Sequence, residues 1–290
     1  MTPVTRKTIL FLFCAAAAIV GAFGPLNDLV RNGQPADYYS HIPLIPVISA
    51  YVLFRRRKQL FKGGPGSLLL GLAVMTLGAG LFIFDKFCQP ELMAHAEICA
   101  SGVILFLSGS YLVLFGKSSF QKALFPFAFL VFVIPLPIAW MELVVSTLVA
   151  GSTGVTHLLF KAFGVPFVQE GAYFYLPGFN IEVAQECSGI RSSIALVITT
   201  VLAGHIFLDK SWKKGLLALA VFPVTVFKNG VRIITLYLLS YFVDMRIIEG
   251  GFLHKSGGFI FFGLGLVIMG YILWVLRGLG VCRLENYPPD

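Results

Sequence analysis

The chain has 290 residues, of which 57% are hydrophobic and only 12% carry a charge. Soluble domains carry about 25% charged residues, so most of this chain has no polar face to present to water. The composition excludes a water-soluble globular domain and predicts an integral membrane protein. The net charge of +8 does not by itself indicate an acidic partner, because in a membrane protein the location of the charges decides their meaning.

Hydropathy predicts an all-α fold, a polytopic helix bundle embedded in the membrane. A bilayer core requires about 20 apolar residues per helix. By that measure about eight segments can span, at residues 8–24, 41–54, 66–84, 97–116, 123–141, 190–208, 215–243 and 258–277. We interpret the first as an uncleaved helix, because the bulky Phe13 precedes Cys14 and the apolar run is long enough to span. Residues 1–290 are predicted to form one membrane-embedded domain.

Basic residues resist translocation and therefore mark the cytoplasmic side of a membrane protein. With the N-terminus inside, the cytoplasmic pieces carry 14 basic and three acidic residues, whereas the opposite loops carry five basic and 11 acidic ones. This asymmetry predicts a protein of the cytoplasmic (inner) membrane with both termini in the cytoplasm. The basic excess then follows from topology, and we expect no nucleic-acid partner.

One long connection, residues 142–189, lies on the outer side between the fifth and sixth predicted spans. Its first part mixes apolar residues with Ser, Thr and Gly, which predicts an interfacial or re-entrant helix. Its second part alternates around Pro177 and Gly178, which suit the two central positions of a type II turn. We therefore predict a small β-hairpin on the outer face that leads directly to Cys187. Its two faces would carry Phe179, Ile181 and Val183 on one side and Asn180 and Glu182 on the other.

The stretch EVAQECSGIRSS, residues 182–193, places Cys187 at the outer mouth of the sixth predicted span. An unpaired cysteine is often a small buried hydrophobe, so Cys187 alone does not predict catalysis. Arg191 lies four residues later and shares a helix face with it. The seventh span carries three polar residues, Lys228, Asn229 and Arg232. Charged residues inside spans usually face a bundle interior or a wet cavity, although an ion pair or snorkelling also accommodates them. No carboxylate lies in the interior of a predicted span, which disfavours the ion pair.

A thiol nucleophile needs a base or a nearby cation, because a free thiol is mostly protonated near neutral pH. His205 is 18 positions from Cys187 on the same predicted helix, about 27 Å away, which excludes it. Three others, His41, His95 and His157, lie in loops or at helix starts without other supporting groups. His254 opens the eighth span between glycines that let the backbone approach closely, unless it is an exposed loop residue.

Together these residues resemble the exosortase/archaeosortase family. ECSGIRSS begins one helix, NGVRI lies in the next, and a histidine opens the one after that. Residues 40–58, SHIPLIPVISAYVLFRRRK, are similar to the second helix of that family and its basic stop, and the likeness covers about residues 38–277. The resemblance implies a membrane cysteine protease or transpeptidase. Its substrates would be exported proteins that end in a sorting signal: a short Pro-containing motif, a transmembrane helix and a basic tail.

Carried over by position, the resemblance implies that Cys187 is the nucleophile, Arg232 stabilises the thiolate and the oxyanion, and His254 is the acid and base. Supporting or substrate-binding roles are expected for Arg191, Lys228, Asn229, Glu186 and Ser188. The site would lie on the periplasmic, outer face. The implied partners are proteins with a PEP-CTERM-like signal, the lipid bilayer and exopolysaccharide-associated machinery, with no cofactor.

One geometric difficulty accompanies this assignment. Arg232 lies about 11 residues before the outer end of its predicted helix, or roughly 16 Å deep at helical rise, whereas Cys187 and His254 lie near the surface. Either the site is a funnel into the membrane, or the helix breaks near Asn229 and Gly230.

Two other functions remain open. A membrane transporter, or a polysaccharide or lipid-linked export component, would also hold a basic intramembrane cavity, and there Cys187→Ser should leave activity largely intact. A thiol-redox protein is the other, since Cys88 and Cys99 are close in sequence on the outer side and able to form a disulfide. A structural bridge or two free thiols fit that pair better than catalysis. The five cysteines include no CxxC pair and give no metal signal.

Overall fold

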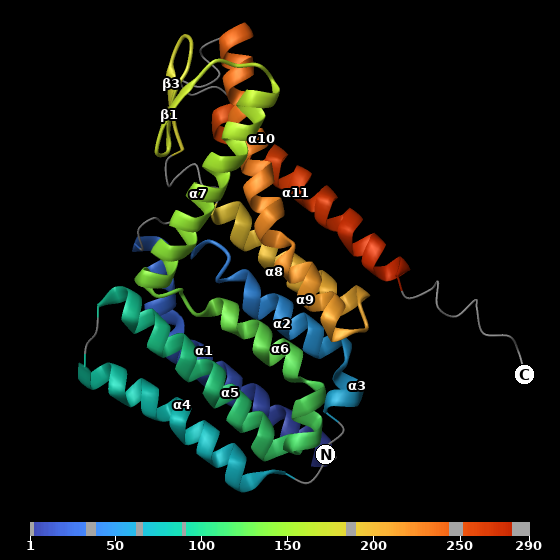
Figure 1. Cartoon of the computed structure of the whole chain (residues 1–290). Coiled ribbons are helices and arrows are strands. Elements are labelled where there is room, and N and C mark those ends of the chain that lie inside the picture. The colour runs from blue at the N-terminus through green and yellow to red at the C-terminus, as the bar shows by residue number, and fades with distance from the viewer. Residues whose placement is uncertain are drawn as a thin grey trace, which may run out of the picture. The chain divides into compact units, whose positions relative to one another are not determined.

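The computed structural model describes residues 3–32, 39–61, 66–88, 91–183, 190–243 and 252–279, without the side chains of 3–4, 32 and 252–257. The described chain is mostly helical, with one small sheet (Figure 1). It divides into two compact units, residues 1–138 and 139–290. By length and composition, seven of the described helices are able to cross a membrane. The prediction of an all-α, polytopic membrane protein is confirmed.

The first unit is built around two long helices that lie side by side, α4 and α5 (Figure 1). Its elements are α1 (Pro3–Asn32), α2 (Leu44–Arg55), α3 (Arg57–Leu60), α4 (Leu68–Cys88), α5 (Leu92–Lys122), α6 (Leu124–Phe129) and the short 3-10 helix η2 (Leu130–Val133). A Cβ added at Gly109 of α5 would lie 2.4 Å from the backbone nitrogen of Met75, and one at Gly78 of α4 would lie 2.5 Å from that of Phe106. The glycines therefore let the two backbones touch, which is how helices associate in a membrane.

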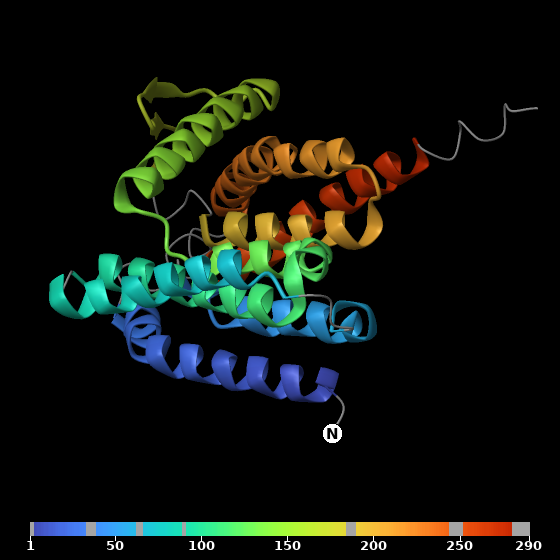
Figure 2. The ribbon, with the colours of Figure 1, turned by 90° about the horizontal axis from the view of Figure 1, so that it is seen from below.

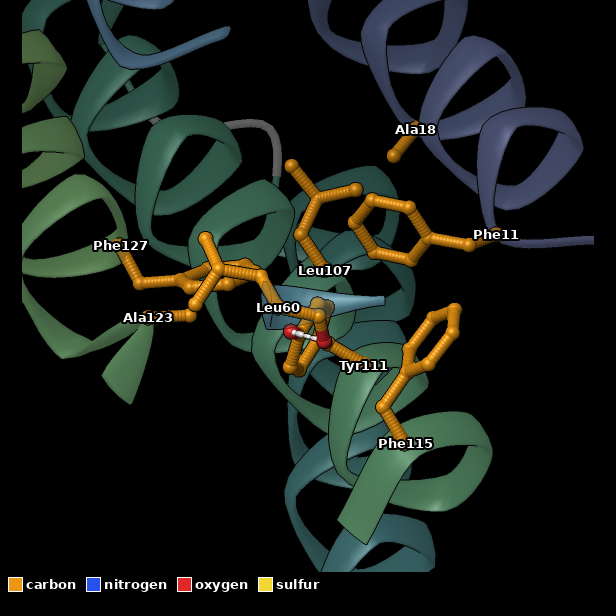
Figure 3. Packing of buried hydrophobic residues seen from close by; sticks show 8 residues of the cluster. All are labelled: Phe11, Ala18, Leu60, Leu107, Tyr111, Phe115, Ala123 and Phe127. Carbon is orange, nitrogen blue, oxygen red and sulfur yellow. Dashed lines mark hydrogen bonds between the residues drawn. The ribbon is translucent and has the colours of Figure 1, made fainter. Parts of the chain in front are cut away.

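Aromatic rings fill the other face of α5. Tyr111 and Phe115 are fully buried, and Phe11 of α1 meets Tyr111 edge to face with ring centroids 5.5 Å apart. The Tyr111 hydroxyl donates a hydrogen bond of 2.6 Å to the Leu60 carbonyl of α3, as Figure 3 shows. This bond satisfies the one polar atom of the cluster, as a buried tyrosine requires.

Helix α5 is interrupted at Gly116, whose φ of 82° lies in the left-handed region that glycine adopts without strain. The amide of the next residue, Lys117, donates to the Ser67 hydroxyl at 3.1 Å, so the freed backbone donor finds a partner. The predicted span over residues 97–116 therefore ends where the helix turns.

Two of the eight predicted spans, residues 41–54 and 123–141, are not long helices. Helix α2 has 12 residues, about 18 Å, which is short of the roughly 30 Å of a bilayer core. The other becomes α6 and η2, and the stretch IPLPI, residues 134–138, then prevents a continuous helix because proline has no amide hydrogen to donate. The two short helices pack on each other, and the Ser49 hydroxyl donates to the Pro126 carbonyl.

The described part of the second unit contains five helices and a three-stranded antiparallel sheet. Its elements are α7 (Ile138–Ala162), β1 (Val168–Glu170), β2 (Tyr173–Tyr175), β3 (Asn180–Glu182), α8 (Ile190–Phe207), α9 (Ser211–Leu219), α10 (Val221–Phe242) and α11 (Phe252–Gly278). Helices α8, α10 and α11 lie next to one another (Figure 2). The stretch expected to be an interfacial or re-entrant helix is α7, which at 25 residues is long and apolar enough to span.

The sheet has the order β1-β2-β3, and the predicted hairpin is its second half. Gly178 has a φ of 93°, as the second central residue of a type II turn requires. Val183 is buried and Asn180 and Glu182 are exposed, so the predicted alternation is confirmed. The strand β1 was not predicted. Phe174 of β2 packs against Phe160 of α7 with ring centroids 5.4 Å apart, which fixes the sheet to that helix.

Candidate active site

The predicted site residues all belong to the second unit, and the structure describes only some of them. Cys187, Glu186 and Ser188 lie outside the described residues. His254 lies in the first turn of α11, where the backbone but not the side chain is described. The remaining four, Arg191, Lys228, Asn229 and Arg232, are described and come from α8 and α10.

Lys228 connects α10 to two neighbouring helices. Its side chain is only 3% exposed, and the ammonium group donates a hydrogen bond to the Ser192 hydroxyl of α8. Its stem lies against α11, where a Cβ added at Gly265 would be 3.3 Å from the Lys228 Cδ and 3.4 Å from Leu196. Ser192 was not among the predicted residues, although it follows the cysteine by five positions.

The next residue, Asn229, joins α10 to α7 on the opposite side. Its amide nitrogen donates to the Ser152 hydroxyl at 3.0 Å, and both side chains are buried. Beside it, a Cβ at Gly230 would lie 2.5 Å from a methyl carbon of Val155. Because α10 is one continuous helix from Val221 to Phe242, the alternative of a helix break near Asn229 and Gly230 is wrong.

Arg232 lies one turn beyond Lys228 on α10 and is partly buried. Its Nε is buried and has no hydrogen-bond partner among the described residues. Within the described part of the chain, no carboxylate forms an ion pair with Lys228 or Arg232. Inserting a charged residue at the centre of a span costs roughly 2.5 to 3.5 kcal/mol on insertion scales. Lys228 and Arg232 are therefore present despite that cost and, among the described residues, without a counterion.

The depth of Arg232 can be compared with the start of α8. Gly204 of α8 packs on Leu217 of α9, and Ser192 meets Lys228 further along, so α8 runs antiparallel to α9 and α10. Arg232 therefore lies within about one helical turn, ~5.4 Å, of the level of Ile190, where α8 begins. Helix α10 continues about 15 Å beyond Arg232 to Phe242 and therefore extends past the level at which α8 begins.

The sheet packs against this C-terminal part of α10. Buried Phe174 and Val183 of the sheet belong to one apolar cluster with Ile233 and Tyr237 of α10. The Tyr237 hydroxyl donates to the Pro177 carbonyl at 3.4 Å. The Val183 amide donates to the Ala172 carbonyl at 2.9 Å, which holds the chain as it leaves β3. The sheet is thus held against α10 in the turns that follow Arg232.

On the exposed face of the sheet, Tyr173 of β2 pairs with Glu182 of β3. A hydrogen bond to the Glu182 carboxylate favours the protonated phenol and raises the pKa of Tyr173 above its ordinary value.

The contact between Lys228 and Gly265 also gives the level of α11. His254 precedes Gly265 by 11 residues and therefore lies about 16 Å further out along that helix, whereas Arg232 lies about 6 Å further out along α10. The Cα atoms of the two residues are separated by about 10 Å along the helix axes.

Two expectations in the first unit require correction. Asp85 lies inside α4 and is 5% exposed, so a carboxylate does occur within a span-length helix. His95, expected to have no supporting group, has its Nδ1 2.5 Å from Asp85 Oδ1. Of the two alternatives left open for Cys88 and Cys99, a structural bridge or two free thiols, the structure has the two free thiols. In the second unit, the His157 Nδ1 similarly lies 2.7 Å from the Gln169 side-chain oxygen.

The family model described as transmembrane exosortase matches residues 31–271. No curated protein and no solved structure matches the chain. The match covers the greater part of both units and contains every predicted site residue.

Proposed function

Because the chain belongs to the transmembrane exosortase family, we propose that it is a cysteine protease or transpeptidase acting on exported proteins. The family supports a general role in processing sorting signals within a membrane. The finer proposal is that Cys187 attacks the peptide bond next to a C-terminal signal composed of a Pro-containing motif, a transmembrane helix and a basic tail, as in PEP-CTERM-like proteins.

The observation that carries this proposal is the hydrogen bond between Lys228 and Ser192. It sets the register of α10 against α8, and one turn outward it brings Arg232 to the level where α8 begins. Cys187 is three residues before Ile190 and four after Val183, so an extended chain limits its Cα to about 11 Å and about 14 Å from theirs. Both flanking residues are buried in the second unit. Connectivity and register therefore support a site in which Arg232 faces the segment that carries the cysteine.

In the proposed reaction the Cys187 thiolate attacks the scissile carbonyl and forms a tetrahedral oxyanion. The C–N bond then breaks, the amine leaves with a proton donated by His254, and a thioester to Cys187 remains. Water or an amine, deprotonated by His254, attacks the thioester and releases the thiolate. Water gives hydrolysis and an amine gives transpeptidation.

Arg232 would stabilise the thiolate and the oxyanion. A fixed cation in a site of low water content acts more strongly than one in bulk water, and Arg232 has no carboxylate partner among the described residues to neutralise it. We propose that the reacting carbonyl lies between Arg232 and His254, whose Cα atoms are about 10 Å apart along the helix axes. His254 would then act at the outer end of the site, where the acceptor enters.

Lys228 and Asn229 are proposed as positioning residues, since both are occupied by contacts to neighbouring helices. Arg191, Glu186 and Ser188 are proposed as supporting residues close to the nucleophile. We further propose an inner-membrane protein with both termini in the cytoplasm and the site on the outer face. Exopolysaccharide-associated machinery remains part of the same proposal.

The test is to co-express the full chain with a reporter protein that ends in such a signal and to follow its size. Cys187→Ala should abolish processing. Arg232→Ala should slow it by about 10² to 10³ fold, the cost of removing an oxyanion donor. His254→Ala should slow it by about 10² to 10⁴ fold.

His205→Ala is the matched control, because His205 lies in the last turn of α8, at the far end from Ile190. It should process the reporter at the wild-type rate. Unchanged processing by Cys187→Ala or Cys187→Ser would exclude the protease and favour a transporter that holds an anionic substrate at Arg232.

A further inference from the structure

Three side chains of the types that bind metals come together in the first unit, where α4 ends and α5 begins. Asp85 lies in the last turn of α4, and His95 and Cys99 lie in the first turns of α5. Their ligand atoms all lie within 4.8 Å of one another. His95 and Cys99 are four residues apart, so they share a face of α5, and that face is turned toward Asp85.

The spacing of the three groups is close to that of a tetrahedral zinc site. Zinc bonds of about 2.0 Å to oxygen and nitrogen and 2.3 Å to sulfur place oxygen and sulfur ligands about 3.5 Å apart, and oxygen and nitrogen ligands about 3.3 Å apart. The Cys99 Sγ is 3.5 Å from Asp85 Oδ2. The His95 Nδ1 is 2.5 Å from the other carboxylate oxygen, Oδ1, so the ring must withdraw by less than 1 Å and the carboxylate must turn to present one oxygen to the ion. Side-chain rotation supplies a movement of that size.

The burial of Asp85 and Cys99 is a second observation that fits a metal site. Asp85 and Cys99 are 5% and 2% exposed, in a helix pair made otherwise of apolar residues. Among the described residues, His95 is the only group that forms an ion pair with Asp85. A buried carboxylate is costly unless it is paired or coordinates a metal. The His95 side chain is 35% exposed, which leaves an entry path and a position for water.

The two helices hold these groups on a rigid frame. The glycine contacts between α4 and α5 bring the backbones together along the pair, for example where a Cβ at Gly78 would lie 2.5 Å from the Phe106 nitrogen. A site on packed helices is held more accurately than one on a loop, so little reorganisation is required when an ion enters.

We propose that Asp85, His95 and Cys99 form a Zn²⁺ site with three protein ligands and a fourth position for water. On binding, the Cys99 thiol releases its proton to solvent and its sulfur bonds the metal, so zinc affinity falls with decreasing pH. The ion fixes the outer end of the α4–α5 pair. This site lies in the first unit and is independent of the proposed protease chemistry.

The test uses the full chain in detergent, free of affinity tag and stripped of metal by a chelator. Zinc titration should show one saturable site per chain. Titration with Co²⁺, a spectroscopic probe for zinc, should show a thiolate-to-cobalt charge-transfer band. Each of three substitutions should weaken zinc binding by about tenfold or more: Asp85→Asn, His95→Gln and Cys99→Ser. Loss of a group that only hydrogen-bonds to a metal ligand already lowers metal affinity by that factor, and loss of a ligand should cost at least as much. Cys99→Ser should also remove the charge-transfer band.

Two variants serve as controls. Cys14→Ser removes a free thiol on α1, and Cys88→Ser removes the exposed thiol nearest in sequence. Both should keep the affinity and the cobalt band. Protection of Cys99 from alkylation by added zinc provides a measurement on the unsubstituted protein, in case a variant does not fold. The proposal is overturned if the wild-type chain shows no stoichiometric site, if Cys99→Ser keeps the band, or if zinc leaves Cys99 alkylation unchanged.

Discussion

Gly109→Ala should separate the two long helices of the first unit. The added Cβ would lie 2.4 Å from the Met75 nitrogen and 2.7 Å from both the Met75 Cα and the Gly71 carbonyl oxygen. Ordinary contact begins near 3.4 Å, so the closest approach is about 1 Å too short. All three atoms belong to the backbone of α4, and no rotation of a side chain relieves the overlap.

The helices must therefore move apart by up to about 1 Å. A radial gap of that size forfeits a quarter to a half of the dispersion energy of each facing atom pair. Overpacking of this kind costs about 1 to 3 kcal/mol of the free energy of unfolding. The control is Gly80→Ala on α4, where an added Cβ meets nothing within 4 Å. That change should stabilise the helix by about 0.5 to 1 kcal/mol through its conformational preference.

Both variants are compared with the wild type by reversible unfolding in mixed micelles with a denaturing detergent. The expected order of stability is Gly80→Ala, wild type, then Gly109→Ala. If Gly109→Ala is at least as stable as Gly80→Ala, the close packing of α4 on α5 is wrong.

The other predictions concern the second unit and the topology. Gly230→Ala should cost about 1 to 3 kcal/mol in the same assay, because its Cβ would lie 2.5 Å from Val155, whereas Gly154→Ala has open space and should cost nothing. Asn229→Ala should cost about 1 to 3 kcal/mol, since it leaves the buried Ser152 hydroxyl without its donor, and equal stability of this variant would remove the role of that bond. A reporter that folds only in the cytoplasm, fused after residue 290, should be active, and an inactive one would contradict the predicted orientation.

Six of the seven span-length helices among the described residues were predictable because each is an apolar run of that length, whereas α7 was expected to be interfacial because Ser, Thr and Gly interrupt its apolar run. Two spans were not predicted correctly, because the ends of α2 and α6 depend on local breaks such as Pro135 and on packing between the short helices. The turn at Pro177 and Gly178 was predictable from local conformational preference alone. Strand β1 was not, since three residues carry little pattern and depend on pairing with β2.

The contacts of the site were harder to predict than its residue types. Lys228 was expected to face a polar interior, but its partner Ser192 depends on the register of α8 against α10. Asp85 lay one residue beyond a predicted span that ended at 84, so it was assigned to a loop. Its partnership with His95 requires the close glycine packing of two helices, and no sequence spacing contains that information.

The central claim is that a thioester forms on Cys187. The most direct measurement is to add hydroxylamine during processing of the reporter and to determine the mass of the released product. The wild-type chain should yield a product with a C-terminal hydroxamate, and Cys187→Ala should yield none. A hydroxamate formed by Cys187→Ala, or an acyl group mapped to Ser192 instead, would contradict the assignment of Cys187 as the nucleophile.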